Sequence, residues 1–323
     1  MAATGKESWQ QVVARSLSSP EEISQVSGLE PASVERVTAL FPARINPYFL
    51  SLTRGPGDPL WRQVMPDPRE LQDIGGSPDP LAEEGSSPVP NLIHRYPDRV
   101  VLLASNQCAI HCRFCNRRRR VGRGAPPPAG ELGPALAYIS AHQELRDVLL
   151  SGGDPLLLED HQLESILAEL RRIPHVEILR IGTRVPSALP QRITPALCRM
   201  LRKYHPLYMS LHFNHPGELT PQARKACSML ADAGIPMGSQ SVLLRGINDD
   251  PDIILELARG LAALRVKPYY LFQLDQVRGA AHFQTPVEKG LEIVGRLARL
   301  LPVELVPQYA VDLPGGGGKA VLG

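Results

Sequence analysis

The chain has 323 residues, of which 43% are hydrophobic and 21% charged, and its formal net charge is +2. These are ordinary values for a globular protein, and the small net charge argues against a polyanionic partner such as nucleic acid. No apolar run reaches the roughly 18 residues that a membrane span needs, and the first residues lack the apolar core of a signal peptide. We therefore expect a cytoplasmic protein that acts on small molecules.

Residues 1–54 have the periodicity of short helices around 9–17, 20–26 and 31–41, with Ser19 among the helix-start signals. This segment is predicted to be a small helical domain. Residues 55–90 are rich in Pro, Gly and Ser, which predicts a connector rather than a core element. The remainder, 91–323, is predicted to be the large domain.

In the large domain, short apolar runs alternate with longer amphipathic stretches. This alternation predicts βαβ units and a parallel sheet. Six or seven units are fewer than the eight of a closed barrel, so we expect an α/β fold, a partial (β/α)6-type TIM barrel, with functional residues where strands end. The predicted strands are 100–104, 148–150, 178–181, 207–213, 239–244, 269–274 and 305–311.

Three of the five cysteines follow the first predicted strand, as Cys108-Ala-Ile-His-Cys112-Arg-Phe-Cys115. The cysteines are too few and too unevenly placed for a disulfide framework. Three thiolates at this spacing can bind three irons of a [4Fe–4S] cluster and leave the fourth iron open to another ligand. The alternative is a zinc site that adds His111, although structural zinc usually has its ligands in two separated pairs.

Other candidate strings also follow predicted strands. Ser151-Gly-Gly-Asp-Pro155 comes after the second strand, where glycines let a ligand approach the backbone, although the same string is also an ordinary turn. Four glycines precede Lys319 after the last strand and would let this lysine form a Schiff base; a disordered tail is the alternative. Asp275 and Asp312 end two apolar strands, where a cap or turn is the commoner role.

The pattern C-x3-C-x-aromatic-C, with Phe114 as the aromatic residue, resembles the signature of radical S-adenosylmethionine (SAM) enzymes. The string Asp312-Leu-Pro-Gly-Gly-Gly-Gly-Lys319 resembles the segment of lysine 2,3-aminomutases whose lysine carries pyridoxal 5′-phosphate (PLP). The resemblance covers nearly everything from Pro88 to Lys319. It implies an isomerase with a [4Fe–4S] cluster, SAM and PLP. Such an enzyme would move the α-amino group of L-lysine to the β-carbon through a PLP aldimine and a 5′-deoxyadenosyl radical.

The resemblance also implies roles for single residues. The cluster ligands would be Cys108, Cys112 and Cys115. The SAM-binding residues would be Phe114, Ser151, Gly152, Gly153 and Asp154. The PLP-binding residues would be Arg95, Tyr96, Arg99, Gln240 and the catalytic Lys319. In the substrate, Arg117 would bind the carboxylate, while Asp275 and Asp312 would bind the distal ammonium.

Three alternatives stay open. The protein could make β-lysine for the modification of elongation factor P, or it could be a 2,3-aminomutase for another cationic amino acid such as arginine or ornithine. The third alternative is a zinc protein that binds nucleic acid through the run Arg117–Arg120. Longer relatives continue into a zinc-binding tail, whereas this chain ends at Gly323 and has Asp250 where a partner cysteine is expected. We therefore expect no structural zinc. The expected partners are a free amino acid and a reduced flavodoxin or ferredoxin as electron donor, without nucleic acid or membrane, in a homo-oligomer.

Overall fold

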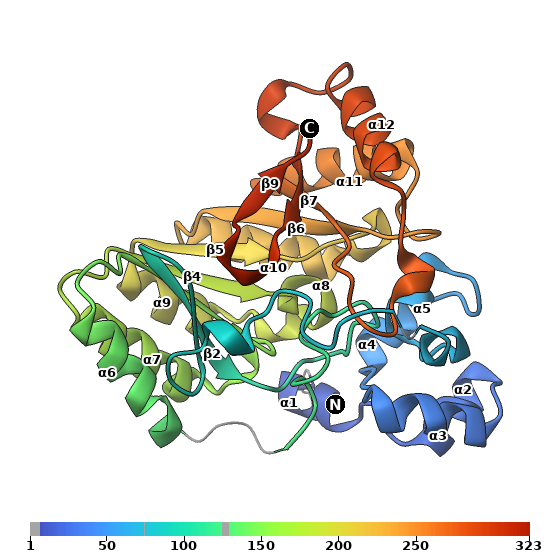
Figure 1. Cartoon of the computed structure of the whole chain (residues 1–323), viewed down its shortest axis with the longest axis horizontal. Helices are drawn as coiled ribbons and strands as arrows, with labels where there is room; N and C mark the ends of the chain where they lie inside the picture. The colour runs from blue at the N-terminus through green and yellow to red at the C-terminus, as the bar shows by residue number, and fades with distance from the viewer. Residues whose placement is uncertain (1–6, 74, 125–128) are drawn as a thin grey trace, which may run out of the picture.

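The computed structural model describes residues 7–73, 75–124 and 129–323. Within these residues, nine strands form one sheet in the order β1 to β9 (Figure 1). Strands β2 to β8 are parallel, while β1 and β9 are antiparallel to their neighbours at the two edges. The strands are β1 (Leu92–Tyr96), β2 (Arg99–Ser105), β3 (Asp147–Gly152), β4 (Ile178–Thr183), β5 (Leu207–Leu211), β6 (Met237–Leu243), β7 (Val266–Gln273), β8 (Gln308–Asp312) and β9 (Lys319–Val321).

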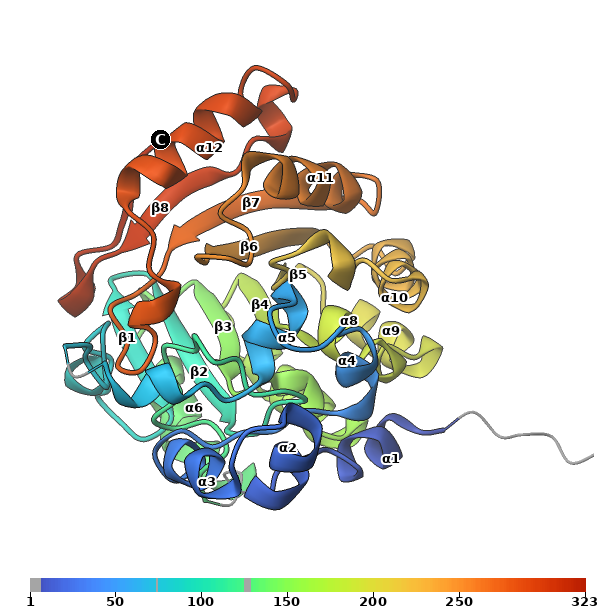
Figure 2. The same ribbon diagram turned by 90° about the vertical axis from the view of Figure 1, so that its right-hand side faces the viewer.

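Helices connect successive parallel strands and lie on the outer side of the curved sheet (Figure 2). The edge strands β1 and β9 do not pair with each other, so the sheet stays open. This architecture confirms the α/β partial barrel predicted from the alternating pattern. The connecting helices are α6 (Gly133–Ala141), α7 (Asp160–Arg171), α8 (Val185–Ala188), α9 (Pro195–Leu201), α10 (Pro221–Asp232), α11 (Pro251–Ala262) and α12 (Val287–Leu297).

The main core lies between the sheet and its helices. Leu150, Leu179 and Leu207 on the strands pack in one apolar cluster with Leu167 of α7 and Leu230 of α10, and all five are fully buried. Burying a side chain of this size stabilises the fold by about 1.5–3 kcal/mol. Because the helices cover the outer face of the sheet, the strands carry apolar residues at the positions that face the helices, which made them recognisable.

All seven predicted strands are present, as β2 to β8, with ends shifted by a few residues. The two edge strands β1 and β9 were not predicted. Both are short and carry polar residues, because an edge strand is only partly covered. β9 begins at Lys319, so the glycine-rich string leads into a strand, and the alternative of a disordered tail is wrong.

The amino-terminal segment forms the predicted short helices, and Ser19 caps the second one through a capping box. Contrary to the expectation of a connector without core elements, segment 55–90 contains a helix, and Leu60 and Val64 in it are buried in the amino-terminal cluster. The division into domains itself stays a prediction. These helices are α1 (Trp9–Ala14), α2 (Pro20–Ser27), α3 (Pro31–Leu40), α4 (Pro47–Ser51) and α5 (Pro59–Val64).

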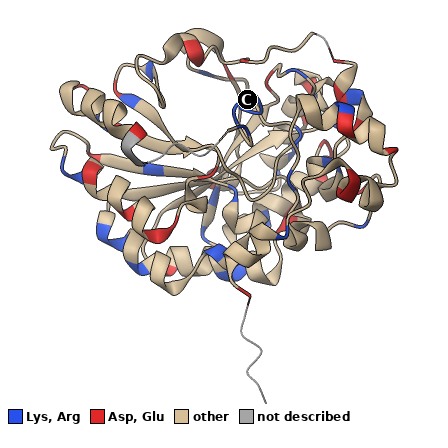
Figure 3. Ribbon diagram, turned by 90° about the horizontal axis from the view of Figure 1, so that it is seen from below, with Lys and Arg blue, Asp and Glu red and all other residues tan. Residues whose placement is uncertain are grey.

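Seen from below, acidic and basic residues, red and blue on the ribbon, are interspersed along the helices (Figure 3). Among the described residues, no helix combines the length and the apolar character needed to cross a membrane.

Candidate active site

A cavity of about 600 Å³ lies inside the curved sheet and reaches the loops that follow its strands. Because these strands are parallel, residues that end different strands meet at the same side of the sheet. Every site residue predicted from the sequence borders this one cavity: Arg95, Tyr96, Arg99, Cys108, Cys112, Phe114, Cys115, Arg117, Ser151, Gly152, Gly153, Asp154, Gln240, Asp275, Asp312 and Lys319. The structure therefore brings the residues together, while their individual roles stay predictions.

The cysteine loop follows β2 and is held by the amino-terminal segments. The amide of His111 donates to the carbonyl of Arg44, and the amide of Arg113 donates to the carbonyl of Gln63, both at 2.9 Å. The buried guanidinium of Arg113 is also paired with the buried carboxylate of Glu70 at 2.7 Å. Segments 1–54 and 55–90 thus shape the loop that carries the three cysteines.

His111 does not take part in the cavity lining. Its Nδ1 lies 3.1 Å from the carbonyl oxygen of Pro42, and burial lowers the pKa of the ring to about 4. This position gives no support to a zinc site made of the three cysteines and His111. Within the described residues, no group of three or more His, Cys, Asp or Glu side chains is arranged to hold a metal ion. The cluster assignment therefore rests on the cysteine loop and on the family, described below.

Arg184, just after β4, is a site residue that sequence reasoning missed. Its Nη1 donates to Sγ of Cys112 at 2.8 Å, and the side chain is only 8% exposed. Burial raises the pKa of the Cys115 thiol to about 11 and raises that of Cys108 well above its ordinary value. Since iron binds the thiolate, loading the cluster must release these protons.

The glycines of the Ser151–Pro155 string serve close packing of the backbone. A Cβ on Gly153 would lie 2.4 Å from the carbonyl oxygen of Gln107, so this loop packs directly against the start of the cysteine loop. The carboxylate of Asp154 accepts hydrogen bonds from the Thr183 hydroxyl (2.8 Å) and from the amide of Arg184 (2.8 Å). Burial raises the pKa of Asp154, although these bonds oppose the shift. Asp154 thus ties the loop after β3 to the end of β4.

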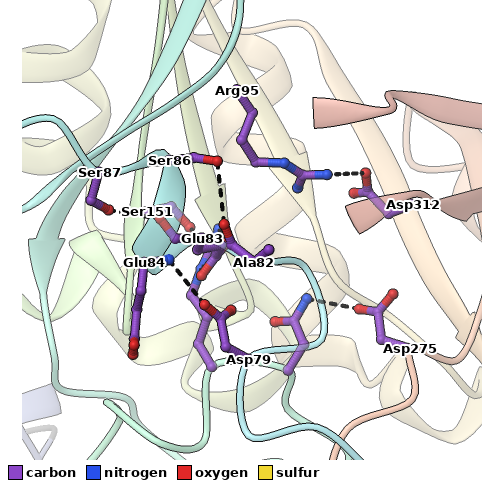
Figure 4. A network of polar contacts seen from close by, with 12 residues as sticks. Asp79, Ala82, Glu83, Glu84, Ser86, Ser87, Arg95, Ser151, Asp275 and Asp312 are labelled. Atoms are coloured by element: carbon purple, nitrogen blue, oxygen red, sulfur yellow. Dashed lines mark hydrogen bonds and ion pairs between the residues drawn. The ribbon is translucent and has the colours of Figure 1, made fainter. Parts of the chain in front are cut away.

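Side chains that border the cavity also join the two edges of the open sheet. Lys319 and Asp312 are register partners in β9 and β8, and Nζ of Lys319 lies 3.0 Å from Oδ2 of Asp312. Arg95 of β1 reaches Oδ1 of the same carboxylate at 3.4 Å (Figure 4). The ring of Tyr96 lies beside Arg99, whose guanidinium carbon is 4.5 Å from the ring centroid. Four of the five predicted PLP residues therefore lie on β1, β2 and β9, at or next to the edges of the sheet, while Gln240 lies on β6 in its middle.

Glu83 is a second site residue that sequence reasoning missed, since it lies in segment 55–90. Nε and Nη2 of Arg117 donate to Oε1 of Glu83 at 2.9 and 2.7 Å, and Nε also lies 3.1 Å from Oε2. Nη1 of Arg117 donates to Oγ of Ser151 at 3.0 Å. Arg119 adds a contact to Glu83 at 3.1 Å. Burial alone would raise the pKa of Glu83, but the two arginines outweigh it and hold the pKa below its ordinary value.

Asp275, just after β7, accepts a hydrogen bond from Asn116 of the cysteine loop at 2.8 Å (Figure 4). Burial raises the pKa of Asp275 to about 6, with further contributions from the charges of Asp312 and Glu83. A carboxyl group with this pKa lacks a full counter-charge in the cavity. A cation bound beside it would favour its ionised form.

The cavity suits the cofactors that the sequence suggests. The three cysteines and the primary amine of Lys319 border the same cavity. Nε of Arg95 and Nε of Arg184 are buried there without a hydrogen-bond partner in the described part of the chain, which leaves donors for anionic ligand groups. A phosphate beside Arg95 and an amino-acid carboxylate near Arg184 would satisfy such donors.

The partial barrel with its cysteine loop defines a radical SAM enzyme. Consistent with this class, the model of the Radical SAM superfamily matches residues 102–258. A solved radical SAM methyltransferase from Sphaerobacter thermophilus is 21% identical, covers 70% of this chain and 72% of its own, and has a TM-score of 0.48, too low to add to the argument.

Curated relatives define the family more closely. An L-lysine 2,3-aminomutase from Fusobacterium nucleatum is 48% identical over 96% of this chain and 75% of the relative. A glutamate 2,3-aminomutase from Clostridioides difficile is 43% identical over 91% and 70%. An L-lysine 2,3-aminomutase from Haemophilus influenzae is 36% identical over 98% and 96%. The chain belongs to the radical SAM lysine 2,3-aminomutase family, whose members are isomerases that use a [4Fe–4S] cluster, SAM and PLP.

Proposed function

We propose that this protein moves the α-amino group of L-lysine to its β-carbon. The observation that carries the proposal is the contact between Lys319 and Asp312, in which a primary alkylammonium is bound by a carboxylate inside the cavity at 3.0 Å. The distal ammonium of a lysine substrate has the same chemistry. Once Lys319 carries PLP, its ammonium no longer pairs with Asp312, whose Oδ2 can then bind the substrate ammonium while Oδ1 keeps its contact with Arg95. Asp275 supplies a second carboxylate in the same cavity.

The carboxylate of the substrate is assigned to Arg117. An arginine has five N–H donors, and the contacts to Glu83 and Ser151 leave one N–H on each terminal nitrogen. Two parallel N–H donors suit a carboxylate. A glutamate substrate would bring a second carboxylate near Asp275 and Asp312, where like charges repel. This charge pattern favours lysine over glutamate. Glutamate is the amino acid in the name of a relative that is 43% identical to this chain.

The other assignments are those that the family resemblance implies, and they are supported by the fact that all of these residues border the same cavity. We assign Cys108, Cys112 and Cys115 to the cluster, Phe114 and the string Ser151–Asp154 to SAM, and Arg95, Tyr96, Arg99, Gln240 and Lys319 to PLP. When bound, these cofactors supply a radical that removes a hydrogen atom and a carbonyl group that carries the migrating amine. The chain itself orients the amino acid between Arg117 and the two aspartates and keeps water out.

Several finer points belong to the same proposal. The electron donor is a reduced flavodoxin or ferredoxin, and the protein works in the cytoplasm, where a reducing environment keeps its cysteines free. The assembly is a homo-oligomer. A use of the product in the modification of elongation factor P stays a prediction.

The substrate assignment can be tested with the anaerobically reconstituted enzyme, PLP, SAM and a reductant. Lysine, ornithine, arginine and glutamate are compared by kcat/KM for the wild type, Asp275→Asn and Asp312→Asn, with the exposed Asp232→Asn as control. Loss of a hydrogen bond to a charged group costs about 1.5–3 kcal/mol, or about 10- to 150-fold. We expect losses of this size for lysine in the two cavity variants and none in the control. A preference for glutamate, or unchanged lysine kinetics in both variants, would contradict the assignment.

A further inference from the structure

Arg184 places a buried positive charge beside one of the three cysteines. The residue follows β4 directly, and its Nη1 donates to Sγ of Cys112 at 2.8 Å. Its guanidinium also lies over the ring of Phe114, 5.6 Å from the centroid. The cysteine spacing gave no hint of this contact, because Arg184 lies 72 residues further along the chain.

The guanidinium is held by a buried network from two other parts of the chain. Nη2 of Arg184 donates to Oε1 of Gln63 in α5 and to Oε2 of Glu218 at 3.2 Å. The second oxygen of Glu218 accepts hydrogen bonds from the amides of Asn214 and His215, each at 3.0 Å. Because both partners are fixed, the side chain cannot swing away from the sulfur without leaving Glu218 buried and unpaired.

We propose that Arg184 is a positioning residue that raises the reduction potential of the cluster bound through Cys112. This inference rests on the assignment of a [4Fe–4S] cluster to the three cysteines. One electron from the reductant converts the oxidised 2+ cluster core to the 1+ core, so negative charge increases on the iron and sulfur atoms. An N–H donor and a cation next to a ligand sulfur stabilise that added charge, and hydrogen bonds to sulfur are among the factors that set such potentials.

Glu218 is expected to act in the opposite direction. Its carboxylate lies 3.2 Å from Arg184 and offsets part of the positive charge that the sulfur experiences. Replacing it by glutamine keeps the shape and removes the negative charge. Arg184→Gln and Glu218→Gln should therefore move the potential in opposite directions, which a merely structural role would not produce.

The test is an anaerobic redox titration of the reconstituted protein without SAM, followed by electron paramagnetic resonance, with iron and sulfide contents measured for each variant. For Arg184→Gln we expect about a tenfold weaker reduction equilibrium, a shift of about 59 mV to more negative potential. Arg184→Lys should recover part of it, and Glu218→Gln should shift the potential to more positive values. Arg180→Gln is the control, since Arg180 borders the same cavity from β4 but pairs with Asp147.

An unchanged potential in a fully loaded Arg184→Gln protein would overturn the inference. So would a shift seen only with SAM present, since Arg184 would then act on SAM rather than on the cluster. If Arg184→Gln binds no cluster, Glu218→Gln decides, and a potential that is unchanged or more negative in that variant refutes the proposal. A wild-type protein without a cluster signal would instead refute the cluster assignment itself.

Discussion

Replacing Glu83 by glutamine removes the negative charge that holds Arg117 in the cavity. The carboxylate is 2% exposed and accepts hydrogen bonds from Arg117 and Arg119. Its neighbour Glu84 also contacts Arg119, at 3.1 Å, but the side chain of Glu84 is 68% exposed. The two adjacent glutamates therefore provide a matched pair, in which one change is buried and the other lies at the surface.

The expected magnitudes follow from this difference in burial. Removing one partner of a buried ion pair costs about 3–5 kcal/mol, because a charge stays buried without compensation. An exposed pair contributes about 0.2–1 kcal/mol. We expect Glu83→Gln to lower the free energy of unfolding of the cofactor-free protein by about 3 kcal/mol, since the glutamine oxygen can still accept one hydrogen bond. Glu84→Gln should lower it by less than about 1 kcal/mol.

Urea unfolding of both variants at neutral pH provides the measurement. The folded-state pKa of Glu83 is depressed, so its contribution is present above the unfolded pKa of about 4.3 and is lost as the pH falls through the folded value. The difference between wild type and Glu83→Gln should therefore shrink in acid. We also expect KM for lysine to rise in Glu83→Gln because Arg117 is less well oriented. Equal losses of stability in the two variants, or a difference that does not depend on pH, would refute the reasoning.

Three further predictions concern other parts of the cavity. Burial raises the pKa of Asp275 to about 6, so its ionisation opposes folding. The contribution of Asp275 to the free energy of unfolding of the cofactor-free protein should fall by about 2 kcal/mol as the pH rises from 4 to 6, and the difference between wild type and Asp275→Asn in urea unfolding should change with pH by this amount. Lys319→Ala should abolish covalent attachment of PLP, measured by borohydride reduction and mass spectrometry, without loss of iron; a PLP adduct in this variant would contradict the assignment. Gly153→Ala should weaken SAM binding at least tenfold in equilibrium dialysis, because the added Cβ would lie 2.4 Å from the carbonyl oxygen of Gln107. Gly182→Ala should leave SAM binding unchanged, because its Cβ would lie 3.6 Å from the nearest atom, Oγ of Ser151.

The parts of the fold that sequence predicted are those with a periodic or local signal. Strands β2 to β8 contain short apolar stretches, such as 100–104 in β2, and the three cysteines stand within eight residues of each other. Lys319 and Asp312 were found through one string, and their direct contact follows from the pairing of β8 with β9. Residues on different strands were predicted to meet because parallel strands end at the same side.

The rest depends on contacts between distant segments. Glu83 lies in a stretch rich in Pro, Gly and Ser, where a glutamate is usually exposed, and only the folded chain brings it to Arg117. The opposite charges of the pair Glu83-Glu84 and of the run Arg117–Arg120 are the one sequence signal that could have suggested this contact. Arg184 belongs to no motif, and its role emerges from a contact with Cys112 across the sheet. The edge strand β1 was missed because only its first two residues are buried and the other three are polar and half-buried.

The most direct test of the account is to identify the product formed from isotope-labelled L-lysine by the reconstituted protein. The account predicts β-lysine with the wild type, and none with Lys319→Ala or Cys112→Ala under the same anaerobic conditions. Cleavage of SAM without any β-lysine would contradict the proposed substrate and leave only the radical SAM chemistry. Formation of β-lysine by the Lys319→Ala protein would contradict the PLP site itself.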